Sequence, residues 1–289
     1  MTIGTDSGDF LAKIRSCYNQ LTRTEKKVAD YVLEHARDVL FMSITELSDA
    51  CGAGETSIFR FCRTVGLGGY QEFKMQRSLS MQVEEGESAV LSGNITPEDD
   101  LSTLVQKVLQ VNQKALTETA ALLDVEELDR AVDLMVAARR ITFFGVGASL
   151  TSAMKAANKF LRIEPRVECV NDAHMQAMVA STLEPQDVAV VFSYSGSTKD
   201  TNAVAQLAHQ AGAKVIAITR FQKSPLTEFT DLTLLCGARE SPLQGGSASA
   251  DIAQSFLVDL LYTEYYRRNF ERCSVCNEKT SASVLNKLF

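Results

Sequence analysis

The spacing of hydrophobic residues changes partway along the chain. Up to about residue 140, apolar residues recur three or four positions apart, which is the spacing of one face of a helix. Beyond residue 140, short apolar runs alternate with amphipathic stretches, a pattern typical of strands that are each followed by a helix. The sequence therefore predicts an all-α head followed by an α/β domain with a mainly parallel sheet flanked by helices.

Within the head, two capping boxes predict where helices begin. Thr22 and Ser43 are each followed by a glutamate three residues later, so each hydroxyl and its glutamate can satisfy backbone N–H groups of the first turn. A glycine-containing break over residues 51–54 separates the helix that begins at Ser43 from the next one, predicted over Glu55–Val65. Two short helices joined by such a turn are typical of a helix-turn-helix unit.

A stretch rich in acidic residues, with glycine and proline among them, follows the head at residues 82–100. This composition is typical of a linker. We therefore expect a helix-turn-helix domain over residues 1–80, a linker over 81–100 and an α/β domain over 101–289. The last of these begins with a helical stretch over 101–137.

In the α/β domain, β-rich apolar runs predict the strands and the stretches between them predict the helices. Strands are expected at 141–144, 167–170, 188–192, 215–219 and 232–236, with helices at about 150–162, 174–182, 200–211 and 250–268.

A hydroxyl-rich loop follows the predicted strand 188–192. Ser193, Ser195, Ser197 and Thr198 come directly after this strand and precede a helix. Ligands of open α/β sheets bind at the carboxyl ends of strands, and a helix N-terminus offers N–H groups to an anion. The loop therefore predicts a phosphate site, although a turn whose serines only cap the helix would have the same composition.

The loop after the first strand has a similar arrangement. It starts Gly145-Val-Gly147, but Leu150 stands where a dinucleotide-binding loop has its third glycine, so no nicotinamide cofactor is expected. Neither loop contains the Gly-Lys-Ser/Thr of a nucleotide-hydrolysing P-loop, so we expect a phosphate to be held and not transferred. The predicted effector-binding residues are Gly147, Ser149, Ser193, Tyr194, Ser195, Gly196, Ser197 and Thr198.

Charge does not by itself predict DNA binding. The net charge is −7, yet residues 1–80 hold ten Lys/Arg and ten Asp/Glu, so the excess of acid lies in the rest of the chain. DNA-binding surfaces are usually basic. A neutral head predicts weak binding by one copy, and a dimer that presents two heads is therefore the expected working unit.

Cysteine usage and the chain start indicate a cytoplasmic protein. The seven cysteines are odd in number and scattered, and residues 1–9 lack the features of a secretory signal. Cys273 and Cys276 are the one closely spaced pair, without the two further ligands of a zinc site nearby, so no metal is expected. No apolar run is long enough to span a membrane.

These motifs resemble those of two known families. Gly145-Val-Gly-Ala-Ser149 and Ser193-Tyr-Ser-Gly-Ser-Thr198 resemble the phosphate loops of the sugar isomerase (SIS) domain, a phosphosugar-binding α/β fold. The head is similar to the helix-turn-helix of RpiR-family regulators, at Ile58-Phe-Arg-Phe-Cys-Arg63 and Gly66-Leu-Gly-Gly-Tyr-Gln-Glu-Phe-Lys74. Together they imply a transcription regulator of sugar metabolism, not an enzyme, in which a phosphorylated sugar controls binding to operator DNA. They also imply a homodimer or homotetramer.

Residues on the outer face of the predicted recognition helix are the candidate DNA contacts. Arg60 can pair with guanine, whereas Arg63 and Lys74 are expected at phosphates. Gly54 departs from the family pattern, which has serine as the cap of this helix, and glycine can serve there at a small cost. The predicted DNA-binding residues are Thr56, Ser57, Arg60, Arg63 and Lys74.

Two other functions are compatible with parts of the sequence. A sugar-phosphate isomerase with an accessory head needs a base, for which His174 and Glu240 are candidates. An interaction protein with a non-binding SIS domain is the other alternative. The residues expected to select the sugar are Glu240, Ser247, Ser249 and Gln254.

Overall fold

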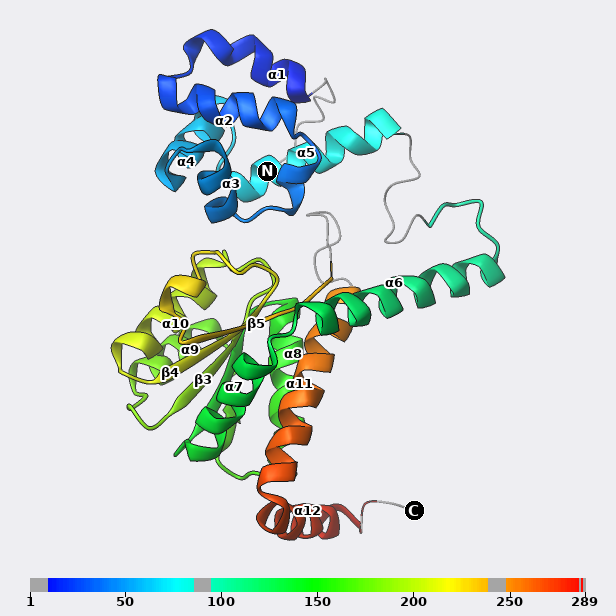
Figure 1. Cartoon of the computed structure of the whole chain (residues 1–289), viewed down its shortest axis with the longest axis vertical. Coiled ribbons are helices and arrows are strands. Elements are labelled where there is room, and N and C mark those ends of the chain that lie inside the picture. Colours follow the sequence, from blue (N-terminus) through cyan, green and yellow to red (C-terminus); the bar gives the residue numbers. More distant parts are fainter. Residues whose placement is uncertain (1–9, 86–94, 239–247, 286, 288–289) are drawn as a thin grey trace. The chain divides into compact units, whose positions relative to one another are not determined.

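The computed structural model describes residues 10–85, 95–238, 248–285 and 287, with the backbone alone at 82–85 (Figure 1). Contacts between residues divide the chain into two compact units, and the division falls within one helix, between Gln113 and Lys114. No helix in these ranges is both long enough and apolar enough to cross a membrane.

The head is a bundle of short helices around one apolar core. Its largest buried side chains include Ile14, Leu47, Ile58, Phe61 and Phe73, so each of several helices contributes one face to the core. The elements are α1 (Phe10–Cys17), η1 (Tyr18–Gln20), α2 (Arg23–Glu34), η2 (Asp38–Phe41), α3 (Ile44–Cys51), α4 (Glu55–Thr64) and α5 (Tyr70–Glu85).

Both capping boxes are confirmed. Thr22 caps α2 and Ser43 caps α3, each accepting from the amide of the glutamate three residues on, whose carboxylate accepts from the cap's own amide. Helix α3 ends at Gly52, whose φ of 60° is the left-handed conformation that glycine adopts without strain. The turn Gly52–Gly54 then leads to α4, so α3 and α4 form the predicted helix-turn-helix unit.

The stretch predicted as helical over 101–137 is two helices, α6 (Leu101–Leu122) and α7 (Val125–Ala137). Asp124 separates them because its carboxylate accepts from the amides of Glu126 and Glu127 and thereby caps α7.

The α/β unit contains a five-stranded sheet in the order β2-β1-β3-β4-β5, in which every pair of neighbours is parallel. Each connection includes helical structure, as parallel neighbours require. The strands are β1 (Ile141–Gly145), β2 (Val167–Cys169), β3 (Val188–Phe192), β4 (Lys214–Thr219) and β5 (Leu232–Leu235), and the connecting helices are α8 (Ala148–Leu161), α9 (Ala173–Ser181), α10 (Lys199–Gln210) and the short η4 (Thr227–Phe229).

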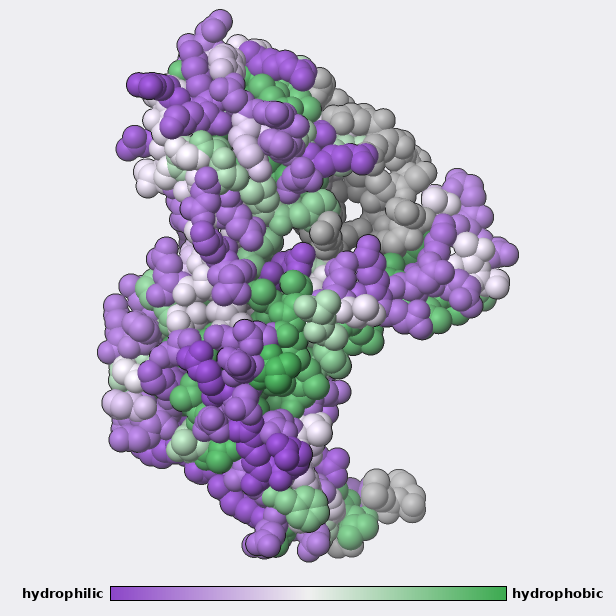
Figure 2. Space-filling model, viewed as in Figure 1, coloured by the Kyte–Doolittle hydropathy of each residue, from purple (hydrophilic) through white to green (hydrophobic). Residues whose placement is uncertain are grey.

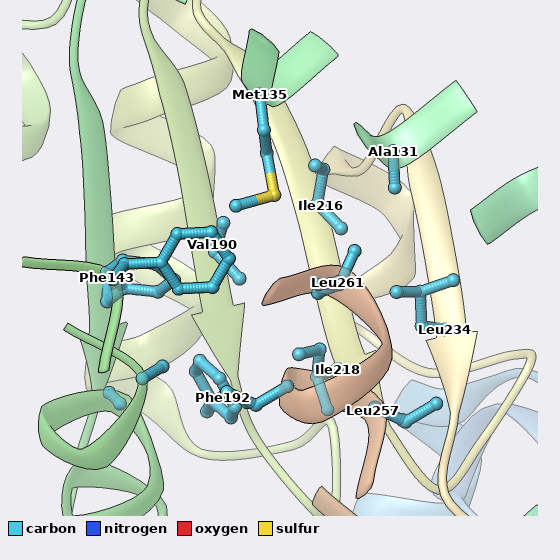
Figure 3. Packing of buried hydrophobic residues seen from close by; sticks show 14 of the residues in the cluster. Ala131, Met135, Phe143, Val190, Phe192, Ile216, Ile218, Leu234, Leu257 and Leu261 are labelled. Atoms are coloured by element: carbon cyan, nitrogen blue, oxygen red, sulfur yellow. The ribbon is translucent and has the colours of Figure 1, made fainter. Parts of the chain in front are cut away.

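Helices cover both faces of the sheet, because alternate strand residues point to opposite sides. Phe143, Val190 and Ile216 pack with residues of α7, α8 and α11 (Ala248–Arg268), as Figure 3 shows for part of this cluster. Ala189 and Val191 pack with α9 and α10 on the other face.

A final helix, α12 (Phe270–Leu285), lies beyond the last helix expected from the sequence, that at 250–268. Its one fully buried apolar residue is Cys273, which gives little hydrophobic periodicity to detect. Polar contacts attach α12 to the α/β unit: Arg272 pairs with the buried Glu164, and the Thr280 hydroxyl donates to the Arg162 carbonyl.

Candidate functional site

The strand order reverses between β1 and β3, which places a switch point at the carboxyl end of the sheet. Strands β1 and β3 are neighbours, yet the helices that follow them lie on opposite faces: α8 packs with one buried cluster and α10 with the other. In open α/β sheets, ligands bind where the strand order reverses in this way. The loops predicted to hold phosphate, 145–149 and 193–198, both begin at this point.

In the second loop, Ser193 is almost fully buried. Its amide donates to the carbonyl of Ile218 on the neighbouring strand, whereas its hydroxyl has no hydrogen-bond partner among the described residues. Gly196 has φ 60°, and a Cβ there would lie 2.2 Å from the Ser224 hydroxyl, so this position requires glycine. The loop therefore approaches the segment after β4 closely and carries an unpaired hydroxyl.

The remaining polar groups of this loop have mixed roles. The Ser195 hydroxyl accepts from the Ser197 amide at 3.2 Å, which orients the turn. Thr198 is the N-cap residue of α10 but makes no side-chain cap, so the first amides of that helix are left for another acceptor. The Tyr194 hydroxyl donates to the Ala238 carbonyl at 2.7 Å, and this side chain therefore anchors the loop.

The first loop has a similar geometry. A Cβ at Gly145 would lie 2.6 Å from the carbonyl oxygen of Ser149, so only glycine allows this close turn. Gly147, the N-cap residue of α8, has φ 60° and ψ −129°, and no side chain caps the helix. Ser149 is half-buried in the first turn of α8. Both loops thus bring uncapped helix N-termini and hydroxyls to one edge of the sheet.

Two further buried polar residues near these loops were missed from the sequence. Gln176 on α9 donates to the carbonyls of Gly145 and Val170, and its own side-chain oxygen has no partner among the described residues. The Ser224 hydroxyl is also buried without a hydrogen-bond partner among the described residues. Neither residue stands in a recognisable motif, so only the packing of the strands reveals them.

The residues expected to select the sugar are only partly described. Glu240 and Ser247 lie outside the described residues. Ser249 and Gln254 are buried on α11. His174 is exposed in the first turn of α9.

A separate cleft of about 490 Å³ lies at the opposite, amino end of the strands. It is lined by Arg139, Arg140, Pro165, Arg166, Val167 and Glu168. The arginines are paired with fully buried carboxylates: Arg139 and Arg140 with Asp187, and Arg166 with Glu164. Burial alone would raise the pKa of Glu164, but hydrogen bonds from Arg166 and Tyr265 lower it to about 2. This edge is neutralised by the protein itself.

In the head, α4 presents a polar outer face. Thr56, Arg60 and Arg63 are exposed, and Ser57 is half-buried. The Arg63 guanidinium lies 5.5 Å from the centre of the Phe59 ring, which is 45% exposed. Glu55 accepts a hydrogen bond from the Thr45 hydroxyl and thereby links α4 to α3.

Lys74 does not lie on this face. The residue is 5% exposed, its ammonium donates to the Met42 carbonyl, and it lies over the ring of Tyr70. Burial lowers the pKa of Lys74 to about 8, against the opposing effect of Glu46. This burial argues against the predicted phosphate contact of Lys74, because the residue lies on the side of α5 that packs inward.

Among the described residues, no group of His, Cys, Asp or Glu is arranged to hold a metal ion. All seven cysteines are free thiols.

Both halves of the chain match known domain families. Residues 8–84 match the helix-turn-helix domain of the rpiR family, and residues 134–264 match the SIS domain. An uncharacterized HTH-type transcriptional regulator of Haemophilus influenzae is 36% identical over 97% of this chain and 98% of its own length. HexR, an HTH-type transcriptional regulator of Pseudomonas aeruginosa, is 35% identical over 78% of each chain.

A solved structure has the same fold over nearly the whole chain. NanR of Vibrio vulnificus, solved in complex with ManNAc-6P, superimposes with a TM-score of 0.85 and 28% identity, covering 97% of this chain and all of NanR. The match spans both the helical head and the α/β unit. The chain therefore belongs to the RpiR family of helix-turn-helix transcriptional regulators.

Proposed function

We propose that the α/β domain holds the phosphate of a phosphorylated sugar at the loops 145–149 and 193–198, and that this binding controls the head's affinity for operator DNA. The observation that carries the proposal is the convergence of two uncapped helix N-termini at the switch point of the sheet. The phosphate would be held by Gly147, Ser149, Ser193, Ser195, Gly196, Ser197 and Thr198, with Tyr194 as an anchor of the loop.

The buried Ser193 hydroxyl supports a ligand role over a capping role. A turn whose serines only cap the helix would direct a hydroxyl to the first amides of α10, and no side chain does so. Buried hydroxyls nearly always have a partner, and one without a partner in the protein requires an explanation. A phosphate oxygen is a strong acceptor for such a donor.

The similarity to NanR supports a sugar phosphate as the ligand class. NanR was solved with ManNAc-6P, and the present chain shares its fold over almost its full length. ManNAc-6P is therefore the first probe for this protein, followed by the common hexose phosphates.

For the head, we propose that α4 reads the major groove of DNA. Arg60 projects from the outer face, where it can pair with guanine, and Arg63 is placed to meet a phosphate. Thr56 and Ser57, in the first turn of α4, would contact base edges or backbone. We also propose the division expected from the sequence, a head over 1–80, a linker over 81–100 and an effector domain over 101–289, with α5 continuing to Glu85.

The working unit is proposed to be a homo-oligomer. Leu101, Val105, Val108 and Leu109 of α6 are all at least 42% exposed, and hydrophobic residues are visible along this helix in Figure 2. A second copy that covers them would remove apolar surface from water and place two heads on one operator. Sedimentation of the full-length protein checks this, with a dimer or tetramer as the expected result.

An isomerase activity is not proposed. Proton transfer beside a carbonyl needs a base held in position, and no hydrogen bond orients the exposed His174 among the described residues. The relatives named above are transcriptional regulators.

The proposal is tested by effector response. An operator is selected from random DNA with the full-length protein, and its binding is measured with and without ManNAc-6P and other hexose phosphates. Ser193→Ala combined with Ser195→Ala is expected to keep the affinity for DNA and to lose the response to effector. Ser181→Ala, which removes an exposed hydroxyl at the end of α9, is the matched control and should respond as the wild type does. A double variant with an unchanged response would overturn the assignment of the loop.

A further inference from the structure

Three residues of α5 carry polar groups into the interior of the head. Tyr70, Lys74 and Arg77 are spaced four and three residues apart, which places them on one face of the helix, and each is 5% exposed or less. Burying a cation is costly unless its charge and donors are satisfied. An apolar side chain would fill this space at lower cost, so two buried cations on one face indicate a specific role.

Four of the described hydrogen bonds from this face end on one segment of backbone, residues 36–42, which joins α2 to α3, and Arg77 also donates to the Ser80 hydroxyl on α5 itself. The carbonyls of this segment are not all used by regular helix and need donors from elsewhere. The hydrogen bonds run from the Tyr70 hydroxyl to the carbonyls of Val39 (2.8 Å) and Met42 (3.2 Å), from the Lys74 ammonium to the carbonyl of Met42 (3.3 Å), and from Arg77 Nε to the carbonyl of Ala36 (3.2 Å).

This segment ends where the helix-turn-helix unit begins. Met42, which receives two of these hydrogen bonds, directly precedes Ser43, the N-cap of α3. Helix α3 is in turn bonded to the turn and to α4, through the Ser48 hydroxyl to the Ala53 carbonyl and through Thr45 to Glu55. The position of the 36–42 segment therefore sets where α3 starts, and α3 sets the position of α4.

We propose that Tyr70, Lys74 and Arg77 form a clamp that fixes the α3–α4 unit on α5, so that Lys74 is a positioning residue for DNA reading. The proposal rests on the proposed reading of DNA by α4. Because α5 leads into the linker, the clamp also connects the linker to the helix-turn-helix unit.

The salt dependence of operator binding separates a positioning residue from a DNA ligand. Log affinity falls with log salt concentration, and loss of one phosphate contact lowers the magnitude of this slope by about 0.9 for each bound head. All slope changes are those per bound head. Lys74→Met in the full-length protein removes the ammonium and keeps most of the volume. We expect operator binding to weaken by about tenfold or more, with the slope unchanged.

Three further variants complete the test. Arg63→Gln is the matched control, an exposed cation of the same head, and should lower the slope by about 0.9 with no change in melting temperature. Lys74→Arg keeps a cation and its N–H donors on a bulkier group and should therefore bind operator more tightly than Lys74→Met does. Tyr70→Phe keeps the ring and removes the hydroxyl donor, so binding should weaken by about fivefold with the slope unchanged, even if Lys74→Met fails to fold.

Two results would overturn the clamp. One is a slope lowered by about 0.9 in Lys74→Met at an unchanged melting temperature, which would make Lys74 a phosphate ligand. The other is operator affinity equal to that of the wild type in Lys74→Met or in Tyr70→Phe. If Arg63→Gln leaves both the slope and the affinity unchanged, the reading of DNA by α4 fails separately, whatever the Lys74 variants do.

Discussion

The two edges of the parallel sheet use polar residues in opposite ways. At the amino end, the carboxylates of Glu164 and Asp187 are fully buried and each is paired with arginine. At the carboxyl end, the hydroxyls of Ser193 and Ser224 and the side-chain oxygen of Gln176 are buried without partners among the described residues. Groups already paired hold the fold together, whereas unpaired groups at a switch point are available to a ligand.

The cleft at the amino end is not the proposed site, for a reason that follows from these ion pairs. The cleft at the amino end is lined with arginines, which would attract a phosphate if they were free. Their charge is neutralised by carboxylates, so a phosphate would have to replace an ion pair that stabilises the fold. These carboxylates are Glu164, Asp187, Glu168 and Glu184. A cleft lined with cations therefore indicates an anion site only where those cations are not already paired with carboxylates.

The largest predicted effect is the loss of stability when a paired carboxylate at the amino end is neutralised. Glu164→Gln leaves Arg166 and Arg272 without their shared counter-ion and should lower the free energy of unfolding of the α/β domain by about 3 kcal/mol. Chemical denaturation measures this loss of unfolding free energy, and sugar-phosphate binding to the folded variant should be unchanged. A variant as stable as the wild type would show that this edge is not structural.

Glu164 should also make the free energy of unfolding depend on pH. Because the folded-state pKa of Glu164 is lowered to about 2 from an ordinary value of 4.5, its contribution is fully present above pH 4.5 and is lost as pH falls toward 2. The difference in unfolding free energy between wild type and Glu164→Gln should therefore shrink over this interval by about 3 kcal/mol. A difference that stays constant down to pH 2 would contradict the assigned pairing.

At the carboxyl end, the effect should fall on ligand binding and not on the fold. Ser193→Ala removes a hydroxyl with no described protein partner, so the free energy of unfolding should change by no more than about 0.5 kcal/mol. Affinity for the sugar phosphate should fall by about 10- to 100-fold, the cost of one hydrogen bond to a charged group. Calorimetric titration measures the affinity. A variant that is destabilised but binds the sugar phosphate normally would show that Ser193 stabilises the fold and does not bind the ligand.

The smallest effect is expected at an exposed pair on the amino edge. Glu168→Gln removes one of the two carboxylate partners of Arg140, at 3.7 Å and with both side chains partly exposed, so the change in unfolding free energy should stay within about 0.5 kcal/mol. This variant is the matched control for Glu164→Gln because it neutralises a carboxylate at the same edge. An equally large loss in both variants would show that burial is not what distinguishes Glu164.

Local sequence signals located most elements of the fold and the two loops of the proposed site. The capping boxes at Thr22 and Ser43 act within a single turn, and the apolar runs of β1 and β3 are buried on both faces, so both are detectable without knowing the rest of the fold. Gly196 was predicted from its loop, and the structure shows the close approaches that require glycine there and at Gly145.

What the sequence did not reveal depends on contacts between distant residues. Lys74 stands in a motif and was expected at DNA, but its side chain is buried because α5 turns that face toward the segment 36–42. Gln176 and Ser224 reach the site from other strand–helix connections and have no motif of their own. Helix α12 is attached largely by polar contacts, which leave no apolar period to detect.

Amide hydrogen exchange of the full-length protein tests the difference between the two edges most directly. The protein is compared with and without the sugar phosphate that gives the largest thermal shift in a panel that includes ManNAc-6P. Ligand should slow exchange in peptides that cover 145–151 and 193–201, which include the uncapped first amides of α8 and α10, and leave residues 164–168 unchanged. Protection confined to 139–140 and 164–168 would place the ligand in the arginine-lined cleft and contradict the account.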